Sequence, residues 1–401
     1  MPSNPIPRKA FAAKIQEALR AEGAPGEYVF DELENTLTHP GRPAFHLETH
    51  YLEAQNQPPY QLEQLTRVYA DHHLRPPTQP ATWEEARKVV FPYVRPKAFH
   101  AHRAFRRLQG EDLPEVPHGV VSEHVTVCIG TPAKKVTLPA SVADLARWGV
   151  TLEETLAVAH TNVERRGVPP WQESKEFPGV YRSPWRDEYG ISRLLFPAMF
   201  RPLALRGDPV IIAPSWQTFL VADSASEQGL VNLGRFGRKL TQTDNFLMYR
   251  PLRARGDALE HWLPPEGHPA HGPLRFLQLM NEGADYAEQA QVGRRFFQRQ
   301  ERPSNIPVPQ VFTLHGGAEL GMLATWREGP PCALPEVDYV AFVRKSESLG
   351  MATWADVNRV LGKELEPMGT YPPRWLARTF PADWQLSSLN LVPWSPSSGP
   401  G

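Results

Sequence analysis

The stretch 185–195, WRDEYGISRLL, holds the densest group of side chains that could do chemistry. Asp187, Tyr189, Ser192 and Arg193 lie in it, directly before an apolar run. At the start of a helix, free N–H groups and an arginine could bind an anion or a peptide. The same residues are typical of a strand-to-helix turn, in which Asp187 or Ser192 caps the helix and Arg193 pairs with a carboxylate. We favour this structural interpretation, with Asp187 as a candidate partner of Arg193 and the following leucines in the core.

Histidines form a second candidate group, because nine of the fourteen lie between positions 39 and 124. HAH would place His100 and His102 on one face of a strand, and HLETH would place His46 and His50 on one face of a helix. A zinc site needs a third ligand and a recognisable spacing, and neither motif supplies them. We therefore expect solvated surface histidines, no metal site and no cofactor.

An enzyme is the alternative class. A hydrolase or transferase acting on a phosphorylated substrate could be centred on Arg193, with His100, His102 or Asp187 as acid–base groups. Against this alternative, the chain has no G-x-S-x-G motif and no glycine-rich phosphate loop followed by a lysine.

Basic and aromatic residues interleave in three stretches, which could bind nucleic acid by stacking and phosphate contacts. These stretches are HRAFRR (102–107), GRFGRK (234–239) and GRRFFQRQER (293–302). Arginines that flank a core phenylalanine give the same pattern. Because 43 basic residues face 44 acidic ones, there is no global field for a polyanion, and we expect no specific nucleic-acid binding.

The composition is that of a folded protein, with 41% hydrophobic and 22% charged residues in 401. Two distant cysteines, Cys128 and Cys332, make no disulfide framework. The amino terminus lacks an apolar signal core, and no apolar run approaches the ~18 residues of a membrane span. We expect a cytoplasmic protein without a membrane partner.

Apolar spacing predicts helices over 8–20 and 60–73, and capping boxes predict helix starts at Thr82 and Thr151. The alternation over 124–130 predicts a half-buried strand. The other expected elements of the first part are a helix over 141–149, a helix over 151–167, a strand over 179–185 and a hairpin of strands 209–213 and 218–222.

Beyond residue 272 we expect a second α+β unit. Its strands are expected over 308–314, 321–326 and 337–343, with a turn in HGGAELG at 315–321. Its clearest helix is expected over 353–365, where Thr353 and Asp356 form the cap.

Changes in composition divide the chain into five segments. They are an N-terminal helical and mixed segment (1–78), an α+β core (79–244), a Pro/Gly-rich linker (245–272), a C-terminal α+β domain (273–386) and a mobile tail (387–401).

Several segments in one order resemble a known family. They are FPYVRPKAF (91–99), AHTNVERR (159–166), GVY (179–181), DEYGISRLL (187–195), IIAPSWQTFLVAD (211–223) and LGRF (233–236). This order resembles the YtpQ-like bacterial family, a domain of unknown function, over roughly residues 8–240. The family pattern GYDASR has an aspartate and an alanine where this chain has Gly190 and Ile191. The resemblance implies a cytoplasmic α+β domain and no particular activity.

Together these patterns predict an α+β protein, with a YtpQ-like mixed α/β unit followed by a second, smaller α+β unit. Eleven tryptophans and eighteen phenylalanines provide aromatic anchors for interfaces. The hypothesis that fits best is a non-enzymatic cytoplasmic interaction or scaffold protein with a protein partner.

Overall fold

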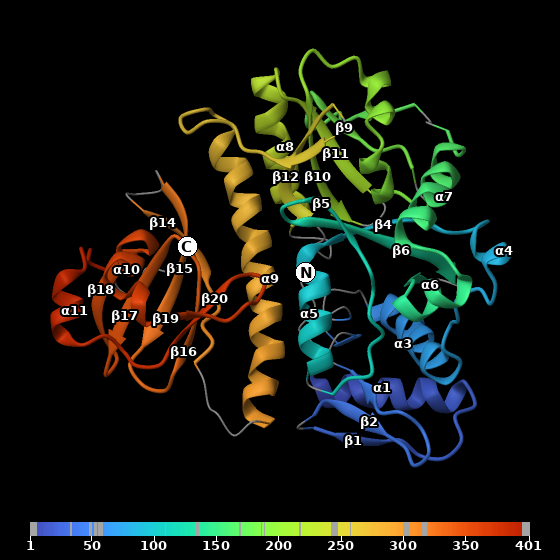
Figure 1. The fold of residues 1–401 in the computed structure, drawn as a ribbon, viewed down its shortest axis with the longest axis horizontal. Helices are drawn as coiled ribbons and strands as arrows, with labels where there is room; N and C mark the ends of the chain where they lie inside the picture. Colours follow the sequence, from blue (N-terminus) through green and yellow to red (C-terminus); the bar gives the residue numbers. More distant parts are fainter. Residues whose placement is uncertain are drawn as a thin grey trace.

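The fold is a mixed α+β arrangement, as expected. A computed structural model describes the chain except for residues 1–5, 33, 48–49, 52–53, 55–58, 109, 134–135, 168–169, 186, 188, 216–217, 242–247, 257, 300–304, 315–318 and 395–401. Figure 1 shows one long helix, α9 (His271–Arg299), between the C-terminal sheets and the rest of the chain.

The N-terminal segment is two packed helices beside a small sheet. Helices α1 (Arg8–Ala21) and α3 (Pro59–Leu74) fall where the sequence predicts them. Phe11, Ile15 and Leu19 form the buried stripe of α1, because i, i+4 and i+8 share one helix face. The three-stranded sheet comprises β1 (Val29–Asp31), β2 (Thr36–Thr38) and β3 (Phe45–His46).

The next sheet has β6 at its centre. Its strands are β4 (Phe91–Pro96), β5 (Gly119–Ser122), β6 (Val125–Ala133) and β7 (Val136–Pro139). The helices of this region are α4 (Trp83–Ala86), α5 (Lys97–Leu108), α6 (Val142–Trp148) and α7 (Leu152–Glu164). Both predicted capping boxes, at Thr82 and Thr151, are present. The prediction of a half-buried strand is wrong, because both faces of β6 from Val125 to Thr131 are buried.

A six-stranded antiparallel sheet follows, in the order β13-β12-β10-β11-β9-β8. Its strands are β8 (Gln172–Glu173), β9 (Val180–Arg182), β10 (Pro209–Ser215), β11 (Thr218–Asp223), β12 (Met248–Arg255) and β13 (Ala258–His261). The predicted hairpin is the β10–β11 pair. Between β9 and β10 lie two 3-10 helices, η1 (Ile191–Leu195) and η2 (Pro197–Leu203), and α8 (Glu227–Leu240) follows β11.

The predicted linker at 245–272 needs correction. Its residues 248–255 and 258–261 are β12 and β13, and Leu252, Ala254 and Leu259 are buried in the core. Proline and glycine density misled the prediction, because Pro251 and Gly256 lie within and beside paired strands. The boundaries of the units stay a prediction.

The C-terminal unit contains two sheets. One has the order β14-β15-β17-β18, with β14 (Gln310–Leu314), β15 (Glu319–Arg327), β17 (Tyr339–Arg344) and β18 (Glu347–Thr353). The other comprises β16 (Cys332–Pro335), β19 (Leu365–Pro367) and β20 (Arg374–Ala377). Its helices are α10 (Trp354–Leu361), η4 (Gly362–Glu364) and α11 (Asp383–Ser388).

Three predicted strands of this unit are confirmed, as is the capped start of its helix, where Thr353 accepts a hydrogen bond from the Asp356 N–H. The α-helix ends at Leu361, short of the predicted end at 365. The start of the predicted mobile tail is not free. Val392 exchanges backbone hydrogen bonds with Met351 of β18, and Asn390 donates to Asp356. Residues 395–401 lie outside the described part of the chain.

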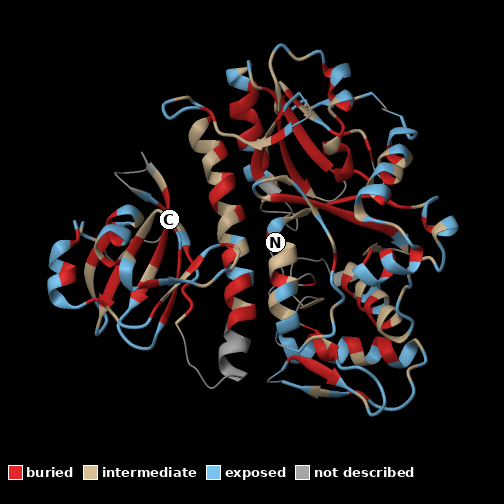
Figure 2. Cartoon of the chain, viewed as in Figure 1, coloured by how far each residue is buried: buried red, intermediate tan, exposed pale blue. Residues whose placement is uncertain are grey.

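Helix α9 was not predicted, and its two apolar faces explain why. Leu274 and Leu277 pack with the six-stranded sheet and α8, whereas Leu279 and Tyr286 pack in the core of the C-terminal unit. Figure 2 shows buried positions along much of its length. A helix buried on two sides has no single stripe at a 3.6-residue period, so the usual sequence signal is lost.

Close contact between α8 and α9 requires a glycine at 234, where an added Cβ would lie 2.5 Å from Pro273 Cβ. We expect Gly234→Ala to lower the free energy of unfolding by ~1–3 kcal/mol, because overpacking forces the helices apart. Denaturant unfolding measures this loss. Gly283→Ala is the control, since its Cβ would meet nothing within 4 Å. The packing argument is wrong if both variants unfold alike.

Candidate functional site

The turn at 185–195 is held by a partly buried ion pair. Arg193 donates from Nη1 to Asp187 Oδ1 at 2.6 Å and from Nη2 to Oδ2 at 2.8 Å. The Arg193 side chain is 1% exposed and its guanidinium lies 4.7 Å from the Trp185 ring centroid. Burial alone would raise the pKa of Asp187, but the hydrogen bonds and charge of Arg193 outweigh it and hold that pKa below its ordinary value. The expected pairing is therefore present.

The other polar groups of the turn also face the protein. Ser192 donates to the Pro92 carbonyl, and η1 has no side-chain cap, so the expected cap by Asp187 or Ser192 is wrong. Tyr189 is 3% exposed, with its ring against Phe91 at 4.6 Å and under the Arg166 guanidinium at 3.8 Å. Leu194 and Phe196 enter the core, whereas Leu195 is only partly buried.

The histidines at 100 and 102 lie on helix α5, so the expected strand face is wrong. His100 stacks on His118 at 3.7 Å, and burial, with the nearby His118, Arg95 and Arg103 charges, lowers its pKa to about 3. His102 is 3% exposed and its Nδ1 lies 3.1 Å from Glu288 Oε2 on α9. The expectation of solvated histidines is therefore wrong for His102.

The six predicted site residues are not brought together as one site. Arg193, Asp187, Tyr189 and Ser192 pack around the core between β4 and the six-stranded sheet, whereas His102 faces α9. The enzyme alternative depends on Arg193 sharing a pocket with these histidines. None of the six lines either of the two pockets described next.

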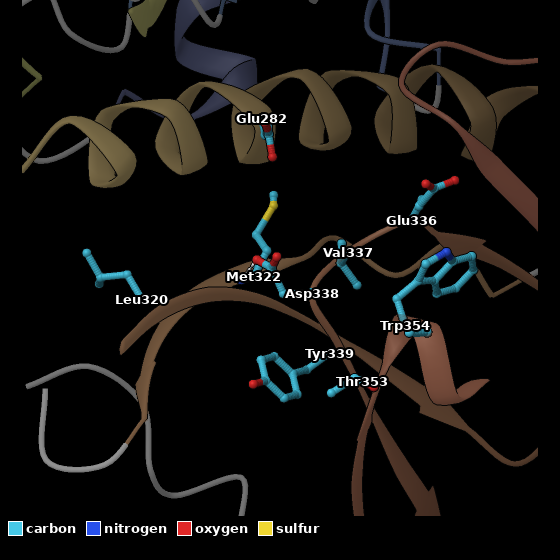
Figure 3. Close-up of a pocket in the computed structure, with 10 residues that line it drawn as sticks. Glu282, Leu320, Met322, Glu336, Val337, Asp338, Tyr339, Thr353 and Trp354 are labelled. Atoms are coloured by element: carbon cyan, nitrogen blue, oxygen red, sulfur yellow. Dashed lines mark hydrogen bonds between the residues drawn. The ribbon is translucent and has the colours of Figure 1, made fainter. Parts of the chain in front are cut away.

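A pocket of about 480 Å³ lies between α9 and the four-stranded sheet of the C-terminal unit, as Figure 3 shows. We call it the acidic–aromatic pocket. Glu282 reaches into it from α9, opposite Met322 and Asp338 of the sheet side. Its lining is Glu282, Leu320, Met322, Glu336, Val337, Asp338, Tyr339, Thr353, Trp354 and Ala355.

The three carboxylates of the pocket differ in their partners. Asp338 accepts from Arg275 at 3.0 Å and from the Met322 N–H at 2.7 Å. Glu336 is exposed and accepts from Trp375 Nε1 at 3.1 Å. Glu282 accepts from Gln278 at 2.8 Å and lies 3.6 Å from the Arg250 guanidinium. Carboxylates thus outnumber the cations beside them.

Two aromatic side chains complete the wall. Tyr339 starts β17 and packs edge-on against Phe312 at 5.3 Å, and Trp354 starts α10 directly after its cap, Thr353. Aromatic faces attract cations, and carboxylates provide the opposite charge, so this combination suits an organic cation. Among the described residues, no group of three or more His, Cys, Asp or Glu side chains is arranged to hold a metal ion.

A second pocket of about 440 Å³ is mainly apolar. It lies between α7, η1 and the strands β5 and β13, and Leu194 and Leu195 of the opening stretch line it. Val120 at its edge is 80% exposed. It offers few groups that could do chemistry, the exception being His160.

Sequence reasoning missed the acidic–aromatic pocket. The sequence PEVDY at 335–339 places Glu336 directly before a predicted strand and Asp338 near its start, and Thr353 marks the start of a predicted helix. Those signals were available, but Glu282 lies on α9, which periodicity did not predict. The side of the pocket that α9 forms could therefore not be placed from the sequence.

Comparisons of the chain with models of protein families, with curated proteins and with solved structures gave no match in any of the three. Within the described part of the chain, none of the helices has both the length and the apolar character that crossing a membrane requires.

The Arg193–Asp187 pair gives a testable stability effect. We expect Arg193→Ala to lower the free energy of unfolding by ~1–3 kcal/mol near neutral pH, because charge-assisted hydrogen bonds are lost. A carboxyl with a lowered pKa stabilises the fold above its ordinary value of 3.8 and loses this effect as the pH falls. The difference between variant and wild type should therefore shrink below that pH.

Denaturant unfolding at several pH values measures the effect. Arg201→Ala in the neighbouring η2 is the matched control, because Arg201 is exposed. An Arg193 variant as stable as the Arg201 variant at neutral pH contradicts the structural role of the pair.

Proposed function

We propose that this chain is a non-enzymatic, cytoplasmic protein-interaction protein, and that its acidic–aromatic pocket binds a lysine or arginine side chain of a partner. The observation that carries the proposal is the convergence of Glu282, Glu336 and Asp338 with two aromatic rings around one cavity. The volume, about 480 Å³, lies in the range of ligand pockets and exceeds what a bare ion needs.

Charge supports a cationic occupant over an anionic one. A phosphorylated ligand in this pocket would face three carboxylates, and like charges repel strongly where water is partly excluded. A long basic side chain can instead lay its methylene groups against Tyr339 and Trp354 while its head reaches a carboxylate. The pocket therefore favours interaction with protein over nucleic acid.

The basic–aromatic stretches give no contrary signal where they are described. Phe236 stacks on Phe177 at 4.8 Å, and Arg238 covers the Phe276 ring at 4.7 Å, so this arginine–phenylalanine stretch is engaged within the fold. The absence of specific nucleic-acid binding stays a prediction. So does the YtpQ-like assignment of residues 8–240, a region that does not include the pocket.

Binding of a tri-lysine peptide tests the proposal. Glu336 is the best position to change, because it is exposed and glutamine keeps an acceptor for Trp375. We expect Glu336→Gln to weaken binding about 5- to 10-fold, the size of a partly exposed charged contact of ~1 kcal/mol or slightly more. Isothermal titration calorimetry at ~0.15 M salt measures the affinity.

Glu347→Gln is the control, since Glu347 is an exposed carboxylate of the same unit that does not line the pocket. Equal losses in both variants indicate a diffuse charge effect and reject the pocket as the site. Binding of a tri-glutamate peptide in place of tri-lysine also rejects the proposal.

A further inference from the structure

We infer that Arg250 sets the affinity of the acidic–aromatic pocket, by competing with the bound cation for Glu282. This inference rests on the proposed function and adds a regulating residue outside the pocket. Arg250 lies on β12 of the six-stranded sheet and does not line the cavity. It acts through Glu282, so it is a positioning residue.

The geometry places Glu282 between the cavity and one cation, Arg250. One side of its carboxylate faces the cavity, where Figure 3 shows it opposite Asp338. The Arg250 guanidinium lies 3.6 Å away and comes from a different layer of the protein. The Arg250 side chain is 8% exposed, so water screens its attraction for Glu282 only weakly.

Arg250 has a second carboxylate partner. Asp285 lies one helical turn after Glu282 on α9, and its Oδ2 is 3.3 Å from Arg250 Nη2. The more firmly Asp285 holds the guanidinium, the less the positive charge of Arg250 neutralises Glu282. Asp285 therefore favours the ligand through Arg250, whereas Arg250 opposes it.

The surroundings of Asp285 make this balance adjustable. Burial raises its pKa to about 6, and the charges of Arg250 and His102 oppose that increase. The charged and titratable groups around it are Arg250 from β12, His102 from α5, Glu282 and Glu288 from α9, and Tyr371 from the segment before β20. A partly protonated carboxyl holds an arginine less firmly than a fully ionised carboxylate does.

The competition is reciprocal, as any linkage between two sites must be. A cation that binds Glu282 loosens Arg250 from α9 by the same free energy by which Arg250 weakens the cation. Cation binding in the pocket is thus coupled to the contact between β12 and α9, one of several contacts that α9 makes with the first unit, beside those with α5 and α8.

Titration of the full chain with the tri-lysine peptide tests the inference. We expect Arg250→Gln to bind at least about fivefold more tightly and Asp285→Asn at least about fivefold more weakly, within the range of such couplings. Lys239→Gln and Glu176→Gln are matched controls, because they remove the same charges from an exposed ion pair that does not line the pocket. Neither control should change the affinity.

A double-variant cycle separates competition from simple attraction. If Asp285 acts through Arg250, Asp285→Asn should have no further effect once Arg250 is glutamine, and Arg250→Gln should have none once Glu282 is glutamine. Effects that persist in those backgrounds overturn the inference.

Should Arg250→Gln fail to fold, Asp285→Asn and Glu282→Gln, singly and combined, carry the same test. Absence of peptide binding by the wild type rejects the proposed function itself, whereas binding that none of these variants changes rejects only the inference.

Discussion

Burial of α9 on two sides is the constraint on which the rest of the structure depends. The apolar residues Leu274 and Leu277 belong to one core, and Leu279 and Tyr286 to another. Arg374 of β20 fixes the C-terminal side, because it is 4% exposed and donates to the carbonyl oxygens of Pro307, Ala333 and Tyr286. These hydrogen bonds offset the cost of burying its guanidinium. The helix therefore cannot move on one sheet without disturbing the other.

Polar positions on α9 follow from the same constraint. Between its two apolar faces the helix carries polar side chains, and Gln278, Glu282 and Asp285 lie on that border. Each polar group on this border needs a partner, and Arg250 of β12 is the partner of both Glu282 and Asp285. The acidic–aromatic pocket lies along this border, so its chemistry is a consequence of how the two units meet.

Local patterns in the sequence predicted local structure well. The capping boxes at Thr82 and Thr151, the α1 stripe and the bond from Arg193 to Asp187 involve residues at most eight positions apart, where spacing decides contact. The features that were missed depend on distant partners. Helix α9 shows no single apolar period, because it packs on both sides. Proline and charged residues mask the strand pattern of β12, whose structure depends on pairing with the distant β10. Glu282 and Asp338 meet across 56 positions, which no spacing rule connects.

The three carboxylates of the pocket divide structural and binding roles. Both oxygens of Asp338 are engaged by Arg275, and one also accepts the Met322 N–H, so this residue chiefly fixes β15 to β17 and α9. Glu336 is exposed, and among the described residues its carboxylate accepts one hydrogen bond, from Trp375, so under the proposed function a cation meets it first. Glu282 is intermediate, because Arg250 already neutralises part of its charge. Under the proposed function, a cation that enters past Glu336 gains most from Glu282 where Arg250 stays beside Asp285, so residues outside the cavity decide the strength of binding.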